Sequence, residues 1–309
     1  MFDFIEIIKT ILPVILVLAI GILCRNKNLL SREGVNALKN VAVNIALPAV
    51  MLNEFATMDY TVNNIIITLM MFVACLAAWF LGKAAGKVLH LNSRFVAFLT
   101  TGFEAGMLGY ALFGMLYGTE RTADFACIDL GQVLFVFTLY KILLGMDGKE
   151  KPTAKSIVSE MLHSPTFVAI VIGVLLGATG LYHALEPSGI SSILDACTDF
   201  ISKPTSVMIL IAIGYDLVLT DVPWGPTCKV VGLRLVIMGV LRVLLGLVLQ
   251  MLGADPGLGQ ALNVMLILPP PYVLPVFADD EDQRTYISSA LSVSTVVAII
   301  GFIVLAAIK

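Results

Sequence analysis

The chain has 309 residues, of which 59% are hydrophobic and only 13% are charged, against about 25% charged in a typical soluble domain. Its mean hydropathy is +0.96 and its net charge is −3, with no basic patch to indicate nucleic-acid binding. Five scattered cysteines form no CxxC pair, so neither a disulfide framework nor a zinc site is indicated. This composition excludes a soluble domain and predicts an all-α polytopic membrane protein.

A membrane-spanning helix needs about 20 apolar residues, and this length divides the chain into ten predicted spans. They are residues 5–24, 35–56, 62–86, 95–117, 122–145, 156–181, 191–216, 229–252, 258–278 and 285–308. The first lacks the basic region and cleavage site of a signal peptide, so we expect it to be retained. The longest hydrophilic connection, residues 146–155, is interpreted as a cytoplasmic linker and is too short to be a domain.

Lysine and arginine concentrate in the loops that follow odd-numbered spans. The linker alone contributes Lys149, Lys151 and Lys155, whereas the loops after even-numbered spans have only Arg121. Because cytoplasmic loops carry the excess of positive charge, the odd-numbered loops are predicted to be cytoplasmic. Both termini are then non-cytoplasmic.

Two proline positions recur in the second half of the chain at nearly the same offset. Pro13 in span one matches Pro165 in span six, and Pro48 in span two matches Pro204 in span seven. Each half has five spans, an odd number, so the second half is expected to be inverted relative to the first. The prediction is a pair of inverted five-helix repeats, residues 1–145 and residues 156–309.

Span nine contains the segment Ile267–Phe277, which carries Pro269, Pro270, Pro271 and Pro275 inside an apolar run. Proline removes an amide donor and clashes with the preceding turn, so no continuous helix is expected here. A broken helix at membrane depth points to a transport site. The alternative is a kinked but closed packing helix.

Span four, the repeat mate of span nine, is also predicted to be broken. It contains Gly102, Gly106, Gly109 and Gly114 but no proline, and Glu104 lies among these glycines. Glycine weakens a helix, and a glutamate at bilayer depth indicates a functional site by default. The alternative is a packing seam of small residues.

The segment Phe103–Leu112, read as Phe-Glu-Ala-Gly-Met-Leu-Gly-Tyr-Ala-Leu, resembles the Asn-Thr-Gly-Phe-Leu-Gly-x-Pro segment of the auxin efflux carrier family. That family includes bacterial malate and malonate permeases. The Asn44-Ile-Ala-Leu-Pro-Ala-Val-Met51 stretch and the proline-rich ninth span are similar to its other marks.

The resemblance implies that spans four and nine cross at their breaks. They would lie in a core domain of spans three to five and eight to ten, set against a scaffold domain of spans one, two, six and seven. It also implies elevator-type motion of the core, a small carboxylate substrate, a homodimer, and location in a bacterial inner (plasma) membrane.

Two residues depart from the family segment. Glu104 stands where the family has asparagine, and Ala111 stands where it has proline. A fixed anion beside the crossover would repel a carboxylate, and it would also provide a site for a coupling H⁺ or Na⁺. Either the coupling ion or the substrate class is therefore expected to differ from the malate-like members.

The predicted substrate and ion site combines both breaks with polar residues at membrane depth. It comprises Glu104, Gly106, Gly109, Tyr110, Pro270, Pro271, Tyr272, Asn44, Asp129 and Lys203. Asn44 either lines the cavity or makes interhelical hydrogen bonds. Asp129 either shares a proton or cation with Glu104 or is a structural partner of Lys141 or Arg242. Lys203 is a candidate for attracting an anion or neutralising Glu104; no cofactor or metal is expected.

The function favoured is a secondary transporter that moves a small organic anion, a mono- or dicarboxylate, by alternating access. An alternative with the same cavity is a non-transporting sensor that binds a ligand or a lipid. An intramembrane enzyme is disfavoured because no HExxH, GxSxG or histidine pair is present.

Overall fold

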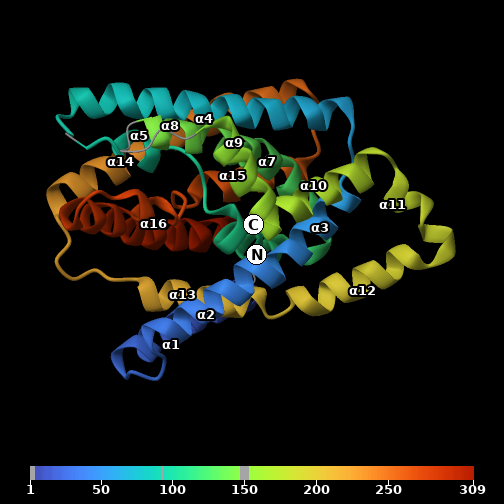
Figure 1. The fold of residues 1–309 in the computed structure, drawn as a ribbon, viewed down its shortest axis with the longest axis horizontal. Helices are drawn as coiled ribbons and strands as arrows, with labels where there is room; N and C mark the ends of the chain where they lie inside the picture. The colour runs from blue at the N-terminus through green and yellow to red at the C-terminus, as the bar shows by residue number, and fades with distance from the viewer. Residues whose placement is uncertain (1–3, 92, 147–152) are drawn as a thin grey trace. The chain divides into compact units, whose positions relative to one another are not determined.

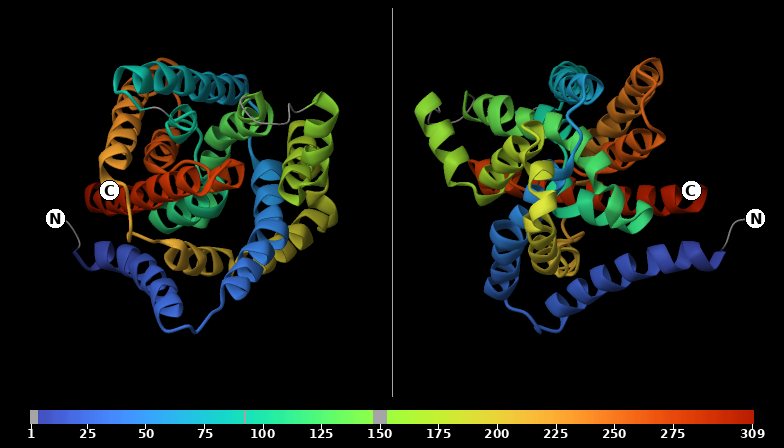
Figure 2. Two further views of the ribbon diagram at one scale, coloured as in Figure 1. Left: turned by 60° about the vertical axis from the view of Figure 1, so that its left-hand side comes forward. Right: turned by 90° about the vertical axis from the view of Figure 1, so that its right-hand side faces the viewer.

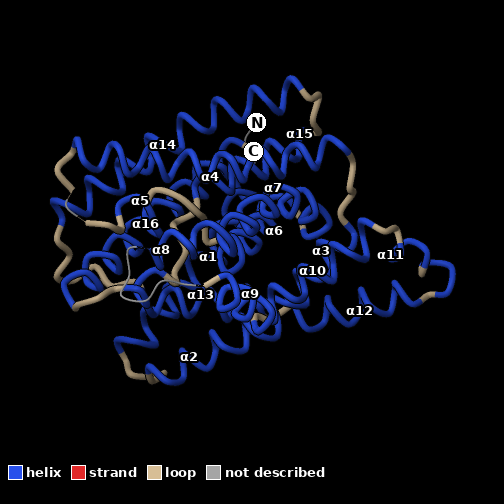
Figure 3. Tube along the Cα trace, turned by 45° about the horizontal axis from the view of Figure 1, so that its top comes forward, coloured by secondary structure: helices blue, strands red, loops and turns tan. Residues whose placement is uncertain are grey.

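The computed structural model describes residues 4–91, 93–146 and 153–309. Throughout these residues the regular elements are helices, and no strand occurs (Figure 3). Seven helices in this part of the chain are long and apolar enough to cross a membrane, or up to eight if one bent pair is a single span. An all-helical polytopic protein is therefore supported, while the ten spans and the inverted repeats stay predictions. Most of the predicted linker, including Lys149 and Lys151, lies outside the described residues.

The chain divides into two compact units. The first unit comprises Met1–Ile65, Gly106–Cys127 and Val158–Leu217, and the second comprises Ile66–Ala105, Ile128–Ile157 and Val218–Lys309. The first unit thus holds the helices of predicted spans one, two, six and seven together with residues 106–127. The predicted core and scaffold domains differ from this division in placing residues 106–127 with the core.

The first unit is built from mostly short helices. Its elements are α1 (Phe4–Asn26), α2 (Arg32–Val41), the π-turn η1 (Ala42–Ala46), α3 (Leu47–Thr57), α6 (Tyr110–Tyr117), η3 (Thr119–Arg121), α10 (Pro165–Ala178), α11 (Leu181–Ala184), η5 (Glu186–Ser188), α12 (Ile190–Ser202) and α13 (Thr205–Asp216). The second unit contains α5 (Val96–Leu99), η4 (Val136–Tyr140), α8 (Lys141–Met146), α14 (Trp224–Met251), α15 (Pro256–Ile267), η6 (Leu274–Phe277) and α16 (Glu281–Ile308). Four elements cross the division: α4 (Val62–Val88), η2 (Ala105–Gly109), α7 (Thr122–Phe135) and α9 (Ala154–His163).

Prolines divide several of the predicted spans. Pro48 follows the π-turn η1 and removes one amide donor from the helical ladder, which explains the local rearrangement there. Pro204 separates α12 from α13. The predicted span 156–181 consists of two helices, because Ser164 caps a new helix, α10, that begins at Pro165. After α10 the chain bends by 68° into Leu181–Ser188.

Two close helix crossings organise the first unit, α1 against α13 and α3 against α10 (Figure 1). A Cβ atom added to Gly21 would lie 2.2 Å from Ile211 O, and one added to Gly173 would lie 2.8 Å from Leu52 O. Gly21 also faces the amide nitrogen of Tyr215, and Gly173 faces that of Ala56. In both cases this nitrogen lies four residues after the contacted carbonyl. Only glycine allows the backbones to approach this closely, and the two crossings follow the same pattern.

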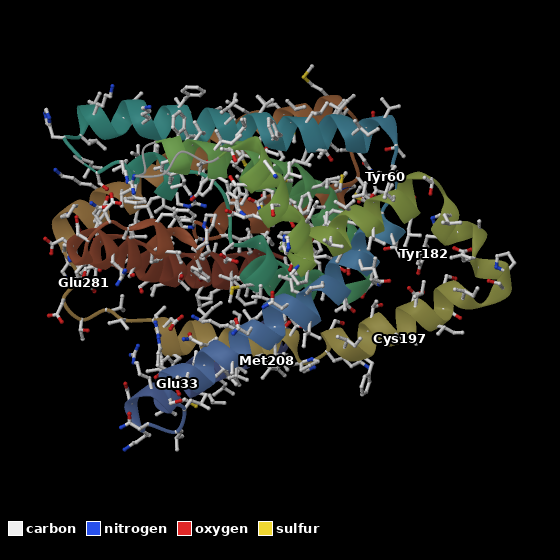
Figure 4. The ribbon with its side chains drawn as sticks, in the orientation of Figure 1. Glu33, Tyr60, Tyr182, Cys197, Met208 and Glu281 are labelled. Carbon is white, nitrogen blue, oxygen red and sulfur yellow. The ribbon has the colours of Figure 1, made fainter. Side chains whose placement is uncertain are left out.

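Tyrosine hydroxyls secure two turns of the first unit, at the positions labelled in Figure 4. Tyr60, between α3 and α4, donates to Phe55 O at 2.7 Å, and burial raises the pKa of this phenol so that it remains a donor. Tyr182 on α11 donates to Asp195 on α12. The first bond holds the turn against the end of α3, and the second joins α11 to α12.

The second unit is framed by long continuous helices. α14 packs against α5, α15 and α16, and α16 runs unbroken to the end of the chain (Figure 2). Asp280 caps α16 by accepting from Gln283 N at 2.8 Å, with Glu281 and Asp282 in the first turn. α5, the first part of the predicted fourth span, and α15, the first part of the ninth, lie against this frame. Neither predicted span is continuous.

Candidate functional site

Two interruptions of helical structure lie in the second unit. α5 ends at Leu99, and helical structure resumes at Ala105 as the π-turn η2. α15 ends at Ile267, and the chain forms no regular helix again until η6 at Leu274. Glycine and proline account for these two breaks: Gly102 has a φ of +68°, and Pro269, Pro270 and Pro271 occupy the second break.

The two breaks bind each other directly. Glu104 N donates to Pro269 O at 2.9 Å, and Tyr272 N donates to the Glu104 carboxylate oxygen Oε2 at 2.7 Å. The ring of Pro271 lies so close to Gly102 that an added Cβ would be 3.1 Å from its Cγ. Glu104 therefore joins the breaks through both its backbone and its side chain.

A buried arginine that the sequence analysis did not single out also joins the breaks. Arg234 on α14 is only 4% exposed. Its Nη1 donates to Leu99 O at 3.2 Å, and its Nη2 donates to Gly102 O at 2.8 Å and to Leu268 O at 2.9 Å. The guanidinium also lies 5.1 Å from the centroid of the Phe103 ring.

The position of Arg234 follows from the electrostatics of helix ends. Leu99 ends α5 and Leu268 follows α15, so their carbonyls lack a partner within their own helices. A cation at a helix C-terminus is stabilised by the partial negative charge of such carbonyls. Arg234 thus replaces the hydrogen bonds that the two breaks remove.

A charged residue inside an apolar span was the signal that could have identified Arg234. The same signal is carried by Arg242, which lies on the same helix and donates to the Asn263 side chain instead. The sequence does not indicate which of the two arginines binds the breaks, because they differ only in the partners that their side chains contact in the folded protein.

Hydroxyl groups surround the two breaks. Tyr140 donates to Phe98 O at 3.3 Å, and Thr101 donates to Cys75 O at 2.5 Å. The Tyr272 hydroxyl lies 2.9 Å from Thr295 Oγ1 on α16. Several other hydroxyl side chains of α16 are buried, namely Ser289, Ser292 and Ser294.

The predicted site residues divide between the two units. Glu104 and Tyr272 are half-buried in the second unit, where Pro270, Pro271 and Asp129 are buried. The Asp129 carboxylate accepts from Gln132 Nε2 at 3.1 Å. The sharing of a proton or cation between Asp129 and Glu104 stays a prediction.

The other predicted site residues belong to the first unit. Gly106 faces Leu47, whose Cδ2 would lie 3.0 Å from an added Cβ, and Tyr110 packs edge-on against Phe125 at 4.8 Å. Gly109 is buried where η2 meets α6. Asn44 in η1 and Lys203 at the end of α12 have exposed side chains. Their roles also stay predictions.

Two cavities occur in the second unit. A small one of about 10 Å³ lies beside Arg234 and has room for about one water molecule. A larger one of about 430 Å³ lies at one end of the unit and is lined by Leu91, Ser93, Asp221, Pro223, Pro226, Asp282, Gln283, Thr285 and Tyr286. Among the described residues, no cluster of three or more histidine, cysteine and acidic side chains is arranged to hold a metal ion.

Comparison with known proteins identifies the family of the chain. Residues 6–306 match the model of a family described as "Membrane transport protein". The chain belongs to this family. The resemblance to the auxin efflux carrier family is thereby confirmed, and the protein is an integral membrane transporter.

Two archaeal relatives, both described as uncharacterized transporters, are consistent with this assignment. The protein from Methanothermobacter thermautotrophicus is 23% identical over 307 residues, covering 95% of each chain. The protein MJ1031 from Methanocaldococcus jannaschii is 22% identical over 217 residues, covering 67% of this chain and 68% of the relative. Family and relatives together indicate a transporter rather than an enzyme.

Proposed function

We propose that the protein is a secondary transporter that moves a small organic anion, a mono- or dicarboxylate, past the two crossed breaks of the second unit. The observation that carries this proposal is the direct binding of the two breaks to each other through Glu104, with Arg234 on their carbonyls. Irregular backbone at membrane depth is tolerated where it is buried or lines a cavity, and transporters place substrates there.

The proposal includes ten spans in two inverted repeats. The matched glycine crossings support it, because Gly21 and Gly173 occupy equivalent predicted positions and approach the opposing helix in the same way. In this scheme each break interrupts one repeat at the same place. The short apolar helices Ala105–Tyr117 and Pro256–Ile267 are then parts of spans four and nine.

Transport is proposed to occur by elevator-type movement of a core domain against a scaffold domain in each subunit of a homodimer. Glu104 carries the coupling H⁺ or Na⁺, and both termini are non-cytoplasmic in a bacterial inner membrane. The division into two compact units is compatible with this scheme, since the breaks belong to one unit and the glycine crossings to the other.

Flux into proteoliposomes tests the proposal. Radiolabelled acetate, lactate, malonate and malate are offered to vesicles containing the purified protein, with and without an inward gradient of H⁺ or Na⁺. We expect gradient-driven accumulation of at least one carboxylate above protein-free vesicles. Binding of a carboxylate without flux would favour the sensor function, and neither binding nor flux of any of the four would overturn the substrate class.

A further inference from the structure

The second break has few groups that can bind an anion. Its three consecutive prolines, Pro269, Pro270 and Pro271, have no amide hydrogen, and the Leu268 amide before them donates to Met265 O. Tyr272 therefore supplies the first amide donor after the prolines. That amide already donates to Glu104 Oε2 at 2.7 Å. A substrate carboxylate that uses this amide must therefore displace the Glu104 carboxylate.

The nearby guanidinium is also engaged by the protein itself. Both terminal nitrogens of Arg234 bind backbone carbonyls, those of Leu99, Gly102 and Leu268. Releasing them would leave three buried carbonyls without hydrogen-bond partners, which is unfavourable in a low-dielectric interior. The Tyr272 amide is the donor that can change partner most readily, because it would exchange one carboxylate for another.

We propose that Glu104 is a tethered competitor of the substrate, and that its carboxylate occupies the Tyr272 amide until neutralisation of Glu104 releases the amide to a substrate carboxylate. This inference rests on the proposed function, since it requires a carboxylate substrate. It also accounts for a glutamate at a place where a fixed anion would otherwise repel that substrate. The Tyr272 amide binds either the ionised Glu104 carboxylate or the substrate carboxylate, and Glu104 is neutral while the substrate is bound.

Charge balance sets the stoichiometry of this exchange. With Arg234 protonated and Glu104 ionised, the pair has no net charge, which suits a low-dielectric site. A bound monocarboxylate adds one negative charge, and one proton on the Glu104 carboxylate cancels it. One proton should therefore accompany each carboxylate group that takes the Tyr272 amide.

The second unit contains other charged or titratable groups that interact with Glu104 or with Arg234. Arg234 on α14 binds the carbonyls of Gly102 and Leu268, one from each break. The Tyr140 phenol from η4 interacts electrostatically with Glu104. Beyond them, Cys75 on α4 interacts electrostatically with both Arg234 and Asp129. If titration of Glu104 causes the pH dependence of carboxylate affinity, substitution of Glu104 alone must therefore abolish that dependence.

Hydrogen exchange tests the contact without any ligand. In a peptide spanning residues 268–275, four prolines and the N-terminal amine of Leu268 leave backbone amides only at Tyr272, Val273 and Leu274. We expect Glu104→Ala to add about one rapidly exchanging amide to this peptide at constant pH. Glu120→Gln, a change at an exposed acid, is the control and should add none. Equal exchange in wild type and Glu104→Ala would overturn the proposal.

Ligand binding tests the competition. The same four labelled carboxylates are bound to purified wild type, Glu104→Gln and Glu120→Gln at pH 6.5 and 8.5. For wild type, the affinity should fall by up to about tenfold per pH unit, because binding requires a proton on Glu104. Glu104→Gln should bind at least as tightly as wild type at pH 6.5 and should show no pH dependence.

The remaining outcomes separate this inference from the proposed function. Loss of binding in Glu104→Gln at both pH values, or a pH profile identical to wild type, overturns the competition. Absence of binding in every protein at both pH values overturns the carboxylate substrate class, while hydrogen exchange still decides the contact. If Glu104→Gln does not yield folded protein, Glu104→Asp serves instead. Its ratio of carboxylate affinities at pH 6.5 and pH 8.5 must then differ from that of wild type.

Discussion

The two units each bring helical segments into close backbone approach, but with different chemistry. In the first unit, Gly21 and Gly214 on one crossing and Gly173 on the other replace side chains with backbone contact. The charged group at the first crossing, Arg25 of α1, binds carbonyls at the end of α13 rather than an acidic side chain. In the second unit, the breaks meet through the Glu104 carboxylate and the Arg234 guanidinium. Glycine packing has one stable arrangement, whereas a hydrogen bond to a carboxylate can be exchanged for another.

This difference indicates which contacts can be exchanged during transport and which only stabilise the fold. Close-packed helices respond to added volume with a loss of stability, because their neighbours cannot relax. A polar contact responds to a change in charge, and its partner can be taken over by a ligand. We therefore expect substitutions in the first unit to act on stability and those at the breaks to act on transport as well.

The largest effect is expected from Arg234→Met. It leaves three carbonyls at the breaks without a donor, which should cost about 3 kcal/mol or more. Thermal unfolding in detergent should show a clear loss of stability, together with loss of uptake. Arg242→Met on the same helix is the matched control, because it removes a bond to one side chain, and its smaller effect is part of the prediction.

The next largest effect is expected from Gly214→Ala in the first unit. The added Cβ would lie 2.2 Å from Leu18 O, so α1 and α13 must separate, at a cost of about 1–3 kcal/mol. Gly239→Ala on α14 meets no atom within 4 Å and should be neutral or slightly stabilising. Equal melting temperatures for the two variants would contradict the close glycine crossing.

Gly102→Ala should affect uptake more than stability. Its φ of +68° alone costs a non-glycine residue about 1–2 kcal/mol, and its Cβ would also press on Pro271. Gly253→Ala is a control with the same backbone strain, since its φ is +60° and no atom lies within 4 Å. If the two variants have similar melting temperatures and only Gly102→Ala loses uptake, the crossing of the breaks is required for transport. Equal uptake by Gly102→Ala and Gly253→Ala would argue against this role.

The smallest effect is expected from Tyr272→Phe, which removes the hydroxyl contact with Thr295 and keeps the backbone amide. One such hydrogen bond contributes about 1 kcal/mol. Thr295→Val should cost more, because it also removes the bond from Thr295 Oγ1 to Leu291 O, and the double variant should be no worse than Thr295→Val alone. A double-variant cycle on unfolding temperatures measures this coupling, and additive effects would contradict it.

Composition and local residue pattern indicate the class of the protein and the two breaks of the second unit, but not the division of residues 156–181 into α9 and α10. Mean hydropathy and apolar lengths predict membrane helices, because a buried backbone in lipid must satisfy its own hydrogen bonds. Prolines at 269–271 and glycine at 102 predict the breaks, since both effects are local to the backbone. Glu104 was recognisable for the same reason, as a charge in an apolar segment.

Only the tertiary structure decided which groups act together. Arg234 and Arg242 carry the same signal in the sequence, yet one binds the carbonyls of both breaks and the other binds Asn263. The contact between Glu104 and Tyr272 joins residues 168 positions apart. Partners at such separations depend on how the breaks cross and on the length of each side chain, which hydropathy and spacing along the chain do not encode.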